Sequence, residues 1–268
     1  MVEKLFLFWV ITFLSCCCSA AEENSVLKEF PSDANQGVAV DDKFFYGISN
    51  TKIVKYEKKS GKIISTWKAD TKQKAFAHFK HLNSGAVING KLYCAHSRFG
   101  VDPNDNSLEI WDVTKEQIKH LETIRLPRKY GSFTWIDKHP DGSWWMCFAV
   151  YGKTENKKTR LVKYKFADNE FIEEKSWQFP VEVANEWGSM SCSGGSWGKD
   201  GFLYTTGHDH EKAFVLKVED QKLELIRVEK NLDLYGQGIA WDRFEKEPIL
   251  WGIKKRKKIT KTLIPEKK

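Results

Sequence analysis

The sequence of 268 residues is poor in proline and glycine, with seven and 18 residues, which excludes a collagen-like or linker-dominated chain. It has no apolar run long enough to span a bilayer, because the longest, residues 5–14, is only about ten residues. Residues 21–253 carry 34 basic and 34 acidic side chains, so the net charge of +7 comes from the end of the chain, residues 254–268. A nucleic-acid-binding protein usually spreads basic charge over a face of its fold, so we expect no nucleic-acid partner. An aromatic content of 13% excludes a disordered chain, and the length suits one substantial core better than two domains.

The N-terminal segment has the pattern of a secretory signal. Lys4 precedes the short apolar run, and small residues lead up to Ala20. We predict a signal peptide over residues 1–20 and a single domain over 21–268 with a basic C-terminal end. The protein is then secreted or periplasmic and has no transmembrane segment in the mature chain. Leu14-Ser15-Cys16 loosely matches a lipid-attachment box, so a lipoprotein anchor on Cys16 stays open, and an uncleaved anchor is the least favoured alternative.

Cysteine is scarce in the predicted mature chain, which has only Cys94, Cys147 and Cys192. No CxxC pattern is present, which argues against a zinc ribbon. Each cysteine stands in an apolar, strand-like stretch, and this favours buried thiols. One disulfide with one free thiol remains open in an oxidising compartment.

A repeated unit runs through the chain. Apolar strands are followed by tight polar turns and by second strands rich in aromatic residues, and the turn dipeptides Asn89-Gly90, Asp141-Gly142 and Asp200-Gly201 indicate hairpins. Further strands follow each hairpin. The copies begin at QGVAVDDKFFYGI (36–48), NSGAVINGKLYCAHS (83–97), GSFTWID (131–137), SGGSWGKDGFLYTTGHD (193–209) and GQGIAWD (236–242).

These units predict an all-β, five-bladed β-propeller. The fifth copy lacks its fourth strand, and residues 26–30 can supply it by pairing with the C-terminal blade. Such closure removes exposed sheet edges. The repeat glycines at positions 37, 85, 131, 195 and 238 suit inner strands that converge on a narrow axis.

Polar side chains recur where the inner strands begin and the second strands end, which places them at one mouth of the axis. Such a mouth is the expected place for a small-molecule pocket. The residues predicted to bind a ligand there are Gln36, His81, Asn83, Ser84, Ser132, Trp135, Ser196, Trp197 and Gln237. Small residues filling the axis, and tryptophans packing between blades, are the alternative explanations for the serines and for Trp135 and Trp197.

The histidines suggest two kinds of chemistry. His96, His208 and Asp209 are candidate catalytic residues, with a histidine as general acid or base. His208 and His210 would share one face of a strand and could bind a divalent metal, the only cofactor that we consider, although a third ligand such as His81 or His96 would be needed. A hydrogen-bonded polar mouth without metal is the favoured alternative. Lys254–Lys258 is predicted to form a basic turn on the mouth side.

Four motifs, HLNSGAVINGKLYCAHS, GSFTWID with DGSWWMCFAVYG, SGGSWGKDGFLYTTGHD and GQGIAWDRFEKEPILWGI, resemble an exported bacterial five-bladed β-propeller family of uncharacterised activity. Some of its members are labelled cycloisomerase-like. The resemblance implies a secreted propeller with a polar mouth and no established reaction. Gln36-Gly37 and Gln237-Gly238 are also similar to the strand opening of plant-type glutaminyl cyclases.

Three functions follow as hypotheses. The first is a monomeric exported propeller that binds a small molecule or peptide at a histidine-rich mouth. The second is an enzyme, a cycloisomerase, lyase or glutaminyl-cyclase-like cyclotransferase, that uses mouth histidines. The third is a protein-interaction propeller. The polar residues at the mouth favour the mouth over the rim.

Overall fold

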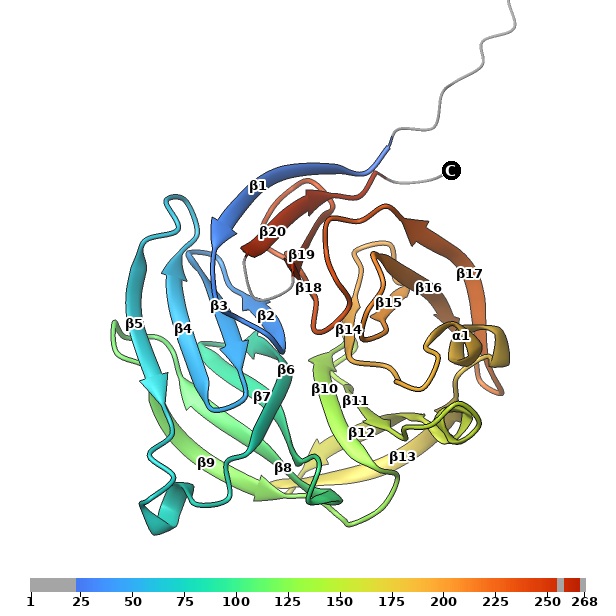
Figure 1. Cartoon of the computed structure of the whole chain (residues 1–268), viewed down its shortest axis with the longest axis horizontal. Coiled ribbons are helices and arrows are strands. Elements are labelled where there is room, and N and C mark those ends of the chain that lie inside the picture. The colour runs from blue at the N-terminus through green and yellow to red at the C-terminus, as the bar shows by residue number, and fades with distance from the viewer. Residues whose placement is uncertain (1–22, 255–257, 266–268) are drawn as a thin grey trace, which may run out of the picture.

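The computed structural model describes residues 23–254 and 258–265. Its strands form five antiparallel four-stranded sheets around a central axis, so the predicted five-bladed β-propeller is confirmed (Figure 1). Residues 1–20, with Cys16, and residues 255–257 of the predicted basic turn lie outside the described residues. The signal peptide, the lipid anchor and the exported location therefore stay predictions.

The blades follow one another along the chain, each from its inner to its outer strand, except that the outer strand of blade 5 comes first in the sequence. Blade 1 contains β2 (Gly37–Val40), β3 (Phe44–Ser49), β4 (Lys52–Glu57) and β5 (Ile63–Lys68). Blade 2 contains β6 (His81–Ile88), β7 (Lys91–Arg98), β8 (Asp102–Asp112) and β9 (Lys119–Arg125). Blade 3 contains β10 (Ser132–Lys138), β11 (Trp144–Ala149), β12 (Arg160–Ala167) and β13 (Glu170–Gln178). Blade 4 contains β14 (Gly194–Trp197), β15 (Leu203–Thr206), β16 (Lys212–Val218) and β17 (Leu223–Lys230). Blade 5 contains β18 (Ala240–Trp241), β19 (Ile249–Lys254), β20 (Lys258–Leu263) and β1 (Ser25–Pro31).

The two ends of the described chain close the ring. β1 pairs antiparallel with β20, with Phe30 opposite Ile259, and so forms the outer edge of blade 5 (Figure 1). The predicted closure by residues 26–30 is confirmed. The first strand in the sequence, β1, therefore completes the sheet formed by the last strands, β18 to β20.

Helical turns occur only in the connections of the described chain. They are η1 (Lys74–Phe76), η2 (Glu155–Lys158) and the short helix α1 (Val181–Glu186). The buried Asn156 fixes α1 to blade 3, because its Nδ2 donates to the carbonyls of Ala184 at 2.8 Å and Gly188 at 2.9 Å. In the part of the chain that the structure describes, no helix has the length and apolar character needed to cross a membrane.

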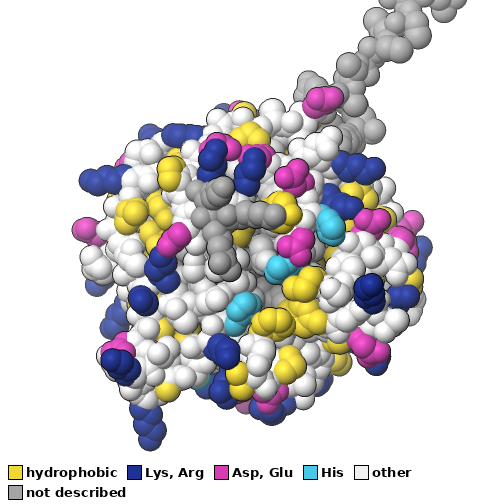
Figure 2. Space-filling model, viewed as in Figure 1, with side chains coloured by type: hydrophobic (Ala, Val, Ile, Leu, Met, Phe, Trp, Pro, Cys, Tyr) yellow, Lys and Arg dark blue, Asp and Glu magenta, His cyan; other side chains and the backbone are white. Residues whose placement is uncertain are grey.

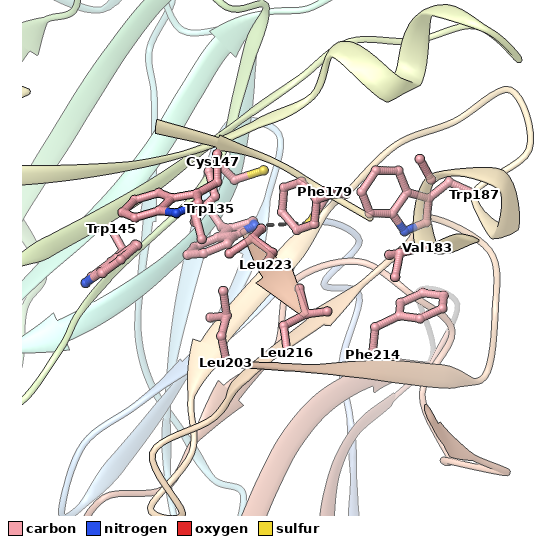
Figure 3. Packing of buried hydrophobic residues seen from close by; sticks show 14 of the residues in the cluster. Trp135, Trp145, Cys147, Phe179, Val183, Trp187, Leu203, Phe214, Leu216 and Leu223 are labelled. Atoms are coloured by element: carbon pink, nitrogen blue, oxygen red, sulfur yellow. Dashed lines mark hydrogen bonds between the residues drawn. The ribbon is translucent and has the colours of Figure 1, made fainter. Parts of the chain in front are cut away.

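Apolar side chains pack between neighbouring blades, because each blade buries both faces of its sheet. The wall between blades 3 and 4 is the richest in tryptophan. It includes Trp135, Trp145 and Trp187, which Figure 3 shows, together with Trp177 and Trp197. Cys147 and Cys192 belong to this wall, and Cys94 to the wall between blades 1 and 2. All three thiols are buried and free, as the favoured interpretation of the sequence expected.

The inner strands meet closely at the axis. A Cβ on Gly37 would lie 3.2 Å from the Cα atoms of both Gly238 and Ser84, and one on Gly194 would lie 2.8 Å from the Cα of Gly238. Blades 1, 2, 4 and 5 therefore touch through backbone atoms. The prediction of close approach holds for positions 37 and 238, whereas a Cβ on Gly85 or Gly195 would instead meet Tyr93 or Trp135.

Candidate functional site

A cavity of about 320 Å³ opens on the face where the inner strands begin. We call it the mouth cavity. Three blades contribute to it, since the residues come from the segment before β2 in blade 1, the segment after β15 in blade 4, and the segment before β18 together with β19 in blade 5. Histidine side chains lie beside the hollow centre of this face (Figure 2). The lining residues are Asn35, Gln36, His208, Asp209, Tyr235, Gln237 and Ile253.

Two glutamines are held at this cavity by the backbone. Gln237 has φ +64°, a left-handed conformation that disfavours any residue but glycine, and it follows Gly236, which also has φ +64°. Gly238 N–H donates to the Gln36 carbonyl at 2.9 Å, which joins blades 5 and 1 at the mouth. Gln36 Nε2 donates to Asn50 Oδ1 at 2.8 Å. A strained, non-glycine residue at a cavity is typical of a functional site.

Two buried polar atoms of the mouth cavity have no hydrogen-bond partner among the described residues: Asn35 Oδ1 and His208 Nδ1. His208 Nδ1 lies 2.7 Å from Asp209 Oδ2, a close contact that lacks the directional geometry of a hydrogen bond. Other buried atoms of the described chain, such as Trp111 Nε1 and Thr205 Oγ1, also lack a partner, so it is the position of these two residues at a polar cavity that makes them candidates for a ligand contact.

His81 lies near this cavity. Its ring is partly buried beside Phe99, at a centroid distance of 5.4 Å. Burial lowers its pKa to about 4, and the charges of His208 and Lys80 act in the same direction. At neutral pH the His81 imidazole is therefore uncharged and can accept a hydrogen bond.

His96, predicted as a catalytic residue, lies in the interior of blade 2 with no exposed surface. Its Nδ1 is 2.8 Å from Ser107 Oγ, and its Nε2 accepts the Lys80 N–H at 3.1 Å. Ser107 Oγ in turn donates to Glu109 at 2.6 Å. Both ring nitrogens are engaged within the fold, which leaves neither for a substrate. The sequence predicts His96 at the mouth, whereas this network holds the imidazole inside blade 2.

Burial of His96 gives the protein a pH dependence. Burial lowers the pKa of His96 from 6.5 to about 4. The charge of Glu109 opposes this shift, and the charges of His78, Arg125 and His81 add to it. Because the unfolded chain binds the proton more readily, the unfolding free energy should fall as pH drops from about 6.5 to about 4, by at most about 3 kcal/mol from this group. Urea titrations across this range test it, and His96→Gln should flatten the profile, leaving the part due to His81. A wild-type profile that is level over this range would contradict the prediction.

The other polar residues predicted for the mouth are mostly buried in the walls around the axis. Asn83 Nδ2 donates to the Phe133 carbonyl at 2.7 Å, and Ser84 fills the contact between Gly37 and Gly238. Ser132 and Trp135 have no exposed surface. Trp135 packs on Gly195 and its Nε1 donates to Cys192 Sγ at 3.3 Å, so it is a core residue.

Ser196 and Trp197 lie toward the opposite face. Ser196 lines a second cavity of about 190 Å³ formed where the inner strands end. Its Oγ donates to Asp137 Oδ2 at 3.1 Å. The guanidinium of Arg243 lies 2.6 Å from Asp137 Oδ2 as well. Trp197 contacts the ring of His139, which belongs to a hairpin turn on that face. The four residues of β14 carry the chain away from the mouth, at about 3.3 Å per residue.

The predicted metal ligands do not form a metal site in the described part of the chain. Residues 207–211 lie beyond β15, which ends at Thr206, so His208 and His210 do not share a strand face. His210 instead acts on the Glu186 carboxylate, whose pKa it helps to lower after the larger effect of Lys212. No group of three His, Cys, Asp or Glu side chains in residues 23–254 and 258–265 is placed to hold an ion.

Sequence reasoning missed Asn35 and Tyr235 at the mouth, and Glu109 and Asp137 within the fold. Asn35 and Tyr235 each stand one or two residues before a glutamine-glycine pair, so that pair was a usable signal. Glu109 stands between two apolar residues and Asp137 follows two of them, and nothing local reveals that donors from other strands surround these carboxylates.

No protein-family model matches the chain, and no curated protein matches it. Several solved structures are similar in fold. The luciferin-regenerating enzyme shares 11% identity at a TM-score of 0.53, over 88% of this chain and 92% of that one. The β-propeller domain of Myceliophteria thermophila Cps50 (Swd1) shares 9% identity at 0.49, over 90% and 100%. A protein of unknown function from Bacteroides caccae shares 11% at 0.43, over 82% and 78%. Likeness at such identities concerns the fold alone.

Proposed function

We propose that this protein is an exported propeller that binds a small polar molecule or peptide in the mouth cavity. The observation that carries the proposal is the polar lining of this cavity, in which neither Asn35 Oδ1 nor His208 Nδ1 has a hydrogen-bond partner among the described residues. A bound ligand would pair with these two groups once their side chains rotate toward the cavity. The volume of the mouth cavity, about 320 Å³, lies at the lower end of small-molecule sites, which span about 300–1,000 Å³.

The strained Gln237 supports the same proposal and yields a test of it. Gln237→Gly removes an amide from the cavity and relieves the left-handed backbone, so we expect stability to rise by about 1 kcal/mol while ligand binding weakens. Asp168→Gly is the matched control, because Asp168 has φ +53° in the β12–β13 turn on the opposite face. It should stabilise the protein and leave binding unchanged. Equal binding by both variants would count against a role for Gln237.

The binding assay is a thermal-shift screen of the protein with a panel of amino acids, dipeptides and dicarboxylic acids. A ligand that binds only the folded state raises the melting temperature. We expect at least one compound to do so, and His208→Ala to abolish the shift. A panel without effect, or a shift that survives both His208→Ala and Gln237→Gly, would refute the proposal.

A second candidate is an enzyme in which His208 acts as general acid or base. The contact of His208 Nδ1 with Asp209 Oδ2 at 2.7 Å favours it, because it places a carboxylate beside a partly exposed imidazole at a cavity, and these are the two side-chain types most used in general acid–base catalysis. The chemistry would be that of a cycloisomerase, lyase or cyclotransferase. NMR spectra of the bound compound, recorded over time, separate the two functions: conversion by the wild type and none by His208→Ala would indicate turnover.

A further inference from the structure

The second cavity, of about 190 Å³, lies where the propeller axis ends on the face opposite the mouth. We call it the axial pocket. Every inner strand lines it near its C-terminal end, through Val40 on β2, Ile88 on β6, Asp137 on β10, Ser196 on β14 and Trp241 on β18. The loop after β18 adds Arg243 and Phe244. No residue lines both this pocket and the mouth cavity among those that the structure describes, so the two sites are separate.

The charge that the axial pocket presents to a solute is positive. Among the described residues, its lining has two charged side chains, Arg243 and Asp137. The Arg243 side chain is 31% exposed, whereas that of Asp137 is 2% exposed. Both carboxylate oxygens of Asp137 are also occupied: Oδ1 accepts the Lys138 N–H at 2.8 Å, and Oδ2 accepts the Trp197 N–H at 2.9 Å as well as Ser196 Oγ and the guanidinium. A solute therefore meets the guanidinium rather than the carboxylate.

Asp137 fixes the orientation of this guanidinium. Its Oδ2 lies 2.6 Å from one terminal nitrogen of Arg243, and this is the one hydrogen bond of the Arg243 side chain within the described chain. A guanidinium carries five N–H donors in a planar fork, so donors remain for a second acceptor. Arginine binds carboxylates through two parallel hydrogen bonds. Because a buried carboxylate already holds Arg243 in place, less conformational entropy is lost when a ligand binds to it.

The accessible walls of the pocket are apolar. Phe244 is 58% exposed, and Ala86, Val87 and Ile88 are partly exposed. These side chains can contact a ligand without any change in the core, because part of their surface already faces solvent. A bare inorganic anion would leave that surface in water, whereas an aliphatic chain would cover it. The small volume favours a short chain, since sites for drug-sized ligands span about 300–1,000 Å³.

We propose that the axial pocket binds a short-chain aliphatic monocarboxylate. The ligand carboxylate accepts hydrogen bonds from the guanidinium of Arg243, and the aliphatic chain lies against Val87, Ile88 and Phe244. This site is independent of the mouth cavity and of the function proposed for it.

The test is a ligand-observed NMR titration of the full chain with acetate, butyrate and hexanoate at neutral pH. We expect saturable binding whose affinity rises about threefold for each added methylene group, because each one buries further apolar surface. Hexanol has the same chain without the charge and should bind at least about tenfold more weakly than hexanoate. Hexylamine, which is protonated at neutral pH, should not bind.

Two variants separate the two ends of the ligand. Arg243→Gln should weaken hexanoate binding about tenfold or more, since it removes the charged donor. The matched control is Arg128→Gln, because Arg128 is 61% exposed and pairs with Asp102 outside the pocket. Arg243→Gln also takes a donor from the buried Asp137, so the exposed Phe244 supplies a variant that leaves this network intact. Phe244→Ala should weaken hexanoate binding about fivefold and leave acetate binding unchanged.

Any of three results would overturn the proposal. The first is the absence of saturable binding of hexanoate by the wild type. The second is acetate binding as tight as that of hexanoate, which would mean that the apolar walls contribute nothing. The third is hexanoate binding that survives both Arg243→Gln and Phe244→Ala. If His208→Ala then abolished it, the ligand would belong to the mouth cavity.

Discussion

Replacing Glu109 by glutamine is expected to lower the free energy of unfolding by about 3–5 kcal/mol. Glu109 has no exposed surface. Its Oε1 lies 2.9 Å from His78 Nε2, and its Oε2 lies 2.9 Å from His120 Nε2. Ser107 and Thr123 also donate to this carboxylate, at 2.6 and 2.7 Å.

The physical reason is that every neighbour of the carboxylate is a donor. Burial opposes ionisation of Glu109, but hydrogen bonds from His120, His78, Ser107 and Thr123 outweigh it and hold the pKa well below its usual value. A glutamine would turn one of the two oxygens into an NH₂ group facing two donors. At least one partly buried histidine and one hydroxyl would then lose their acceptor.

Chemical denaturation of wild type and variant at neutral pH measures the loss. Glu224→Gln provides the control, because the Glu224 side chain on β17 is 43% exposed and its ion pair with Lys222 is worth little. Hydrogen exchange adds a local readout, since His78 ties residues 69–80, the connection between blades 1 and 2, to β8. A loss below about 1 kcal/mol would mean that the four hydrogen bonds do not stabilise the blade as described.

How much of this architecture is visible in the sequence depends on the range of the interaction concerned. Hairpins are local, so the strand pattern and the spacing of Asn89-Gly90 and its equivalents were sufficient to predict five blades and their closure. The direction in which a side chain points is harder to predict from the sequence. A β-bulge between Leu82 and Gly85 changes the alternation of β6, and so it turns Asn83 and Ser84 into the walls of the axis.

The candidate site shows the same limit. Gln36, His208, Asp209 and Gln237 were predicted for the mouth, and all four line one cavity, because each stands at a strand end where the topology alone decides the face. His96 also stands near a strand end, yet Ser107 on the neighbouring strand β8 draws its imidazole into the blade. Contacts between strands that are distant in sequence cannot be derived from the pattern of one strand.

The axis itself gives the second large prediction. Gly238→Ala should lower the unfolding free energy by about 3 kcal/mol or more, because the new Cβ would lie 2.4 Å from Ser84 Oγ, 2.5 Å from Ser84 Cβ and 2.8 Å from the Cα of Gly37. The side chain of Ser84 can rotate only within a packed wall, and the backbone of Gly37 belongs to another blade. Relief therefore requires blades 1, 2 and 5 to move apart.

Two variants separate this steric effect from the general cost of replacing glycine. Gly100→Ala has open space around its Cβ but φ +77°, so it should cost about 1 kcal/mol through the backbone alone. Ser84→Gly removes two of the three close contacts, and in the Gly238→Ala background it should recover about 1–2 kcal/mol, although it destabilises the wild type. Calorimetric unfolding of the four proteins of this double-mutant cycle gives the coupling. Strictly additive effects would mean that the blades are not in contact at the axis, and that the ring is held by β1 and the inter-blade walls alone.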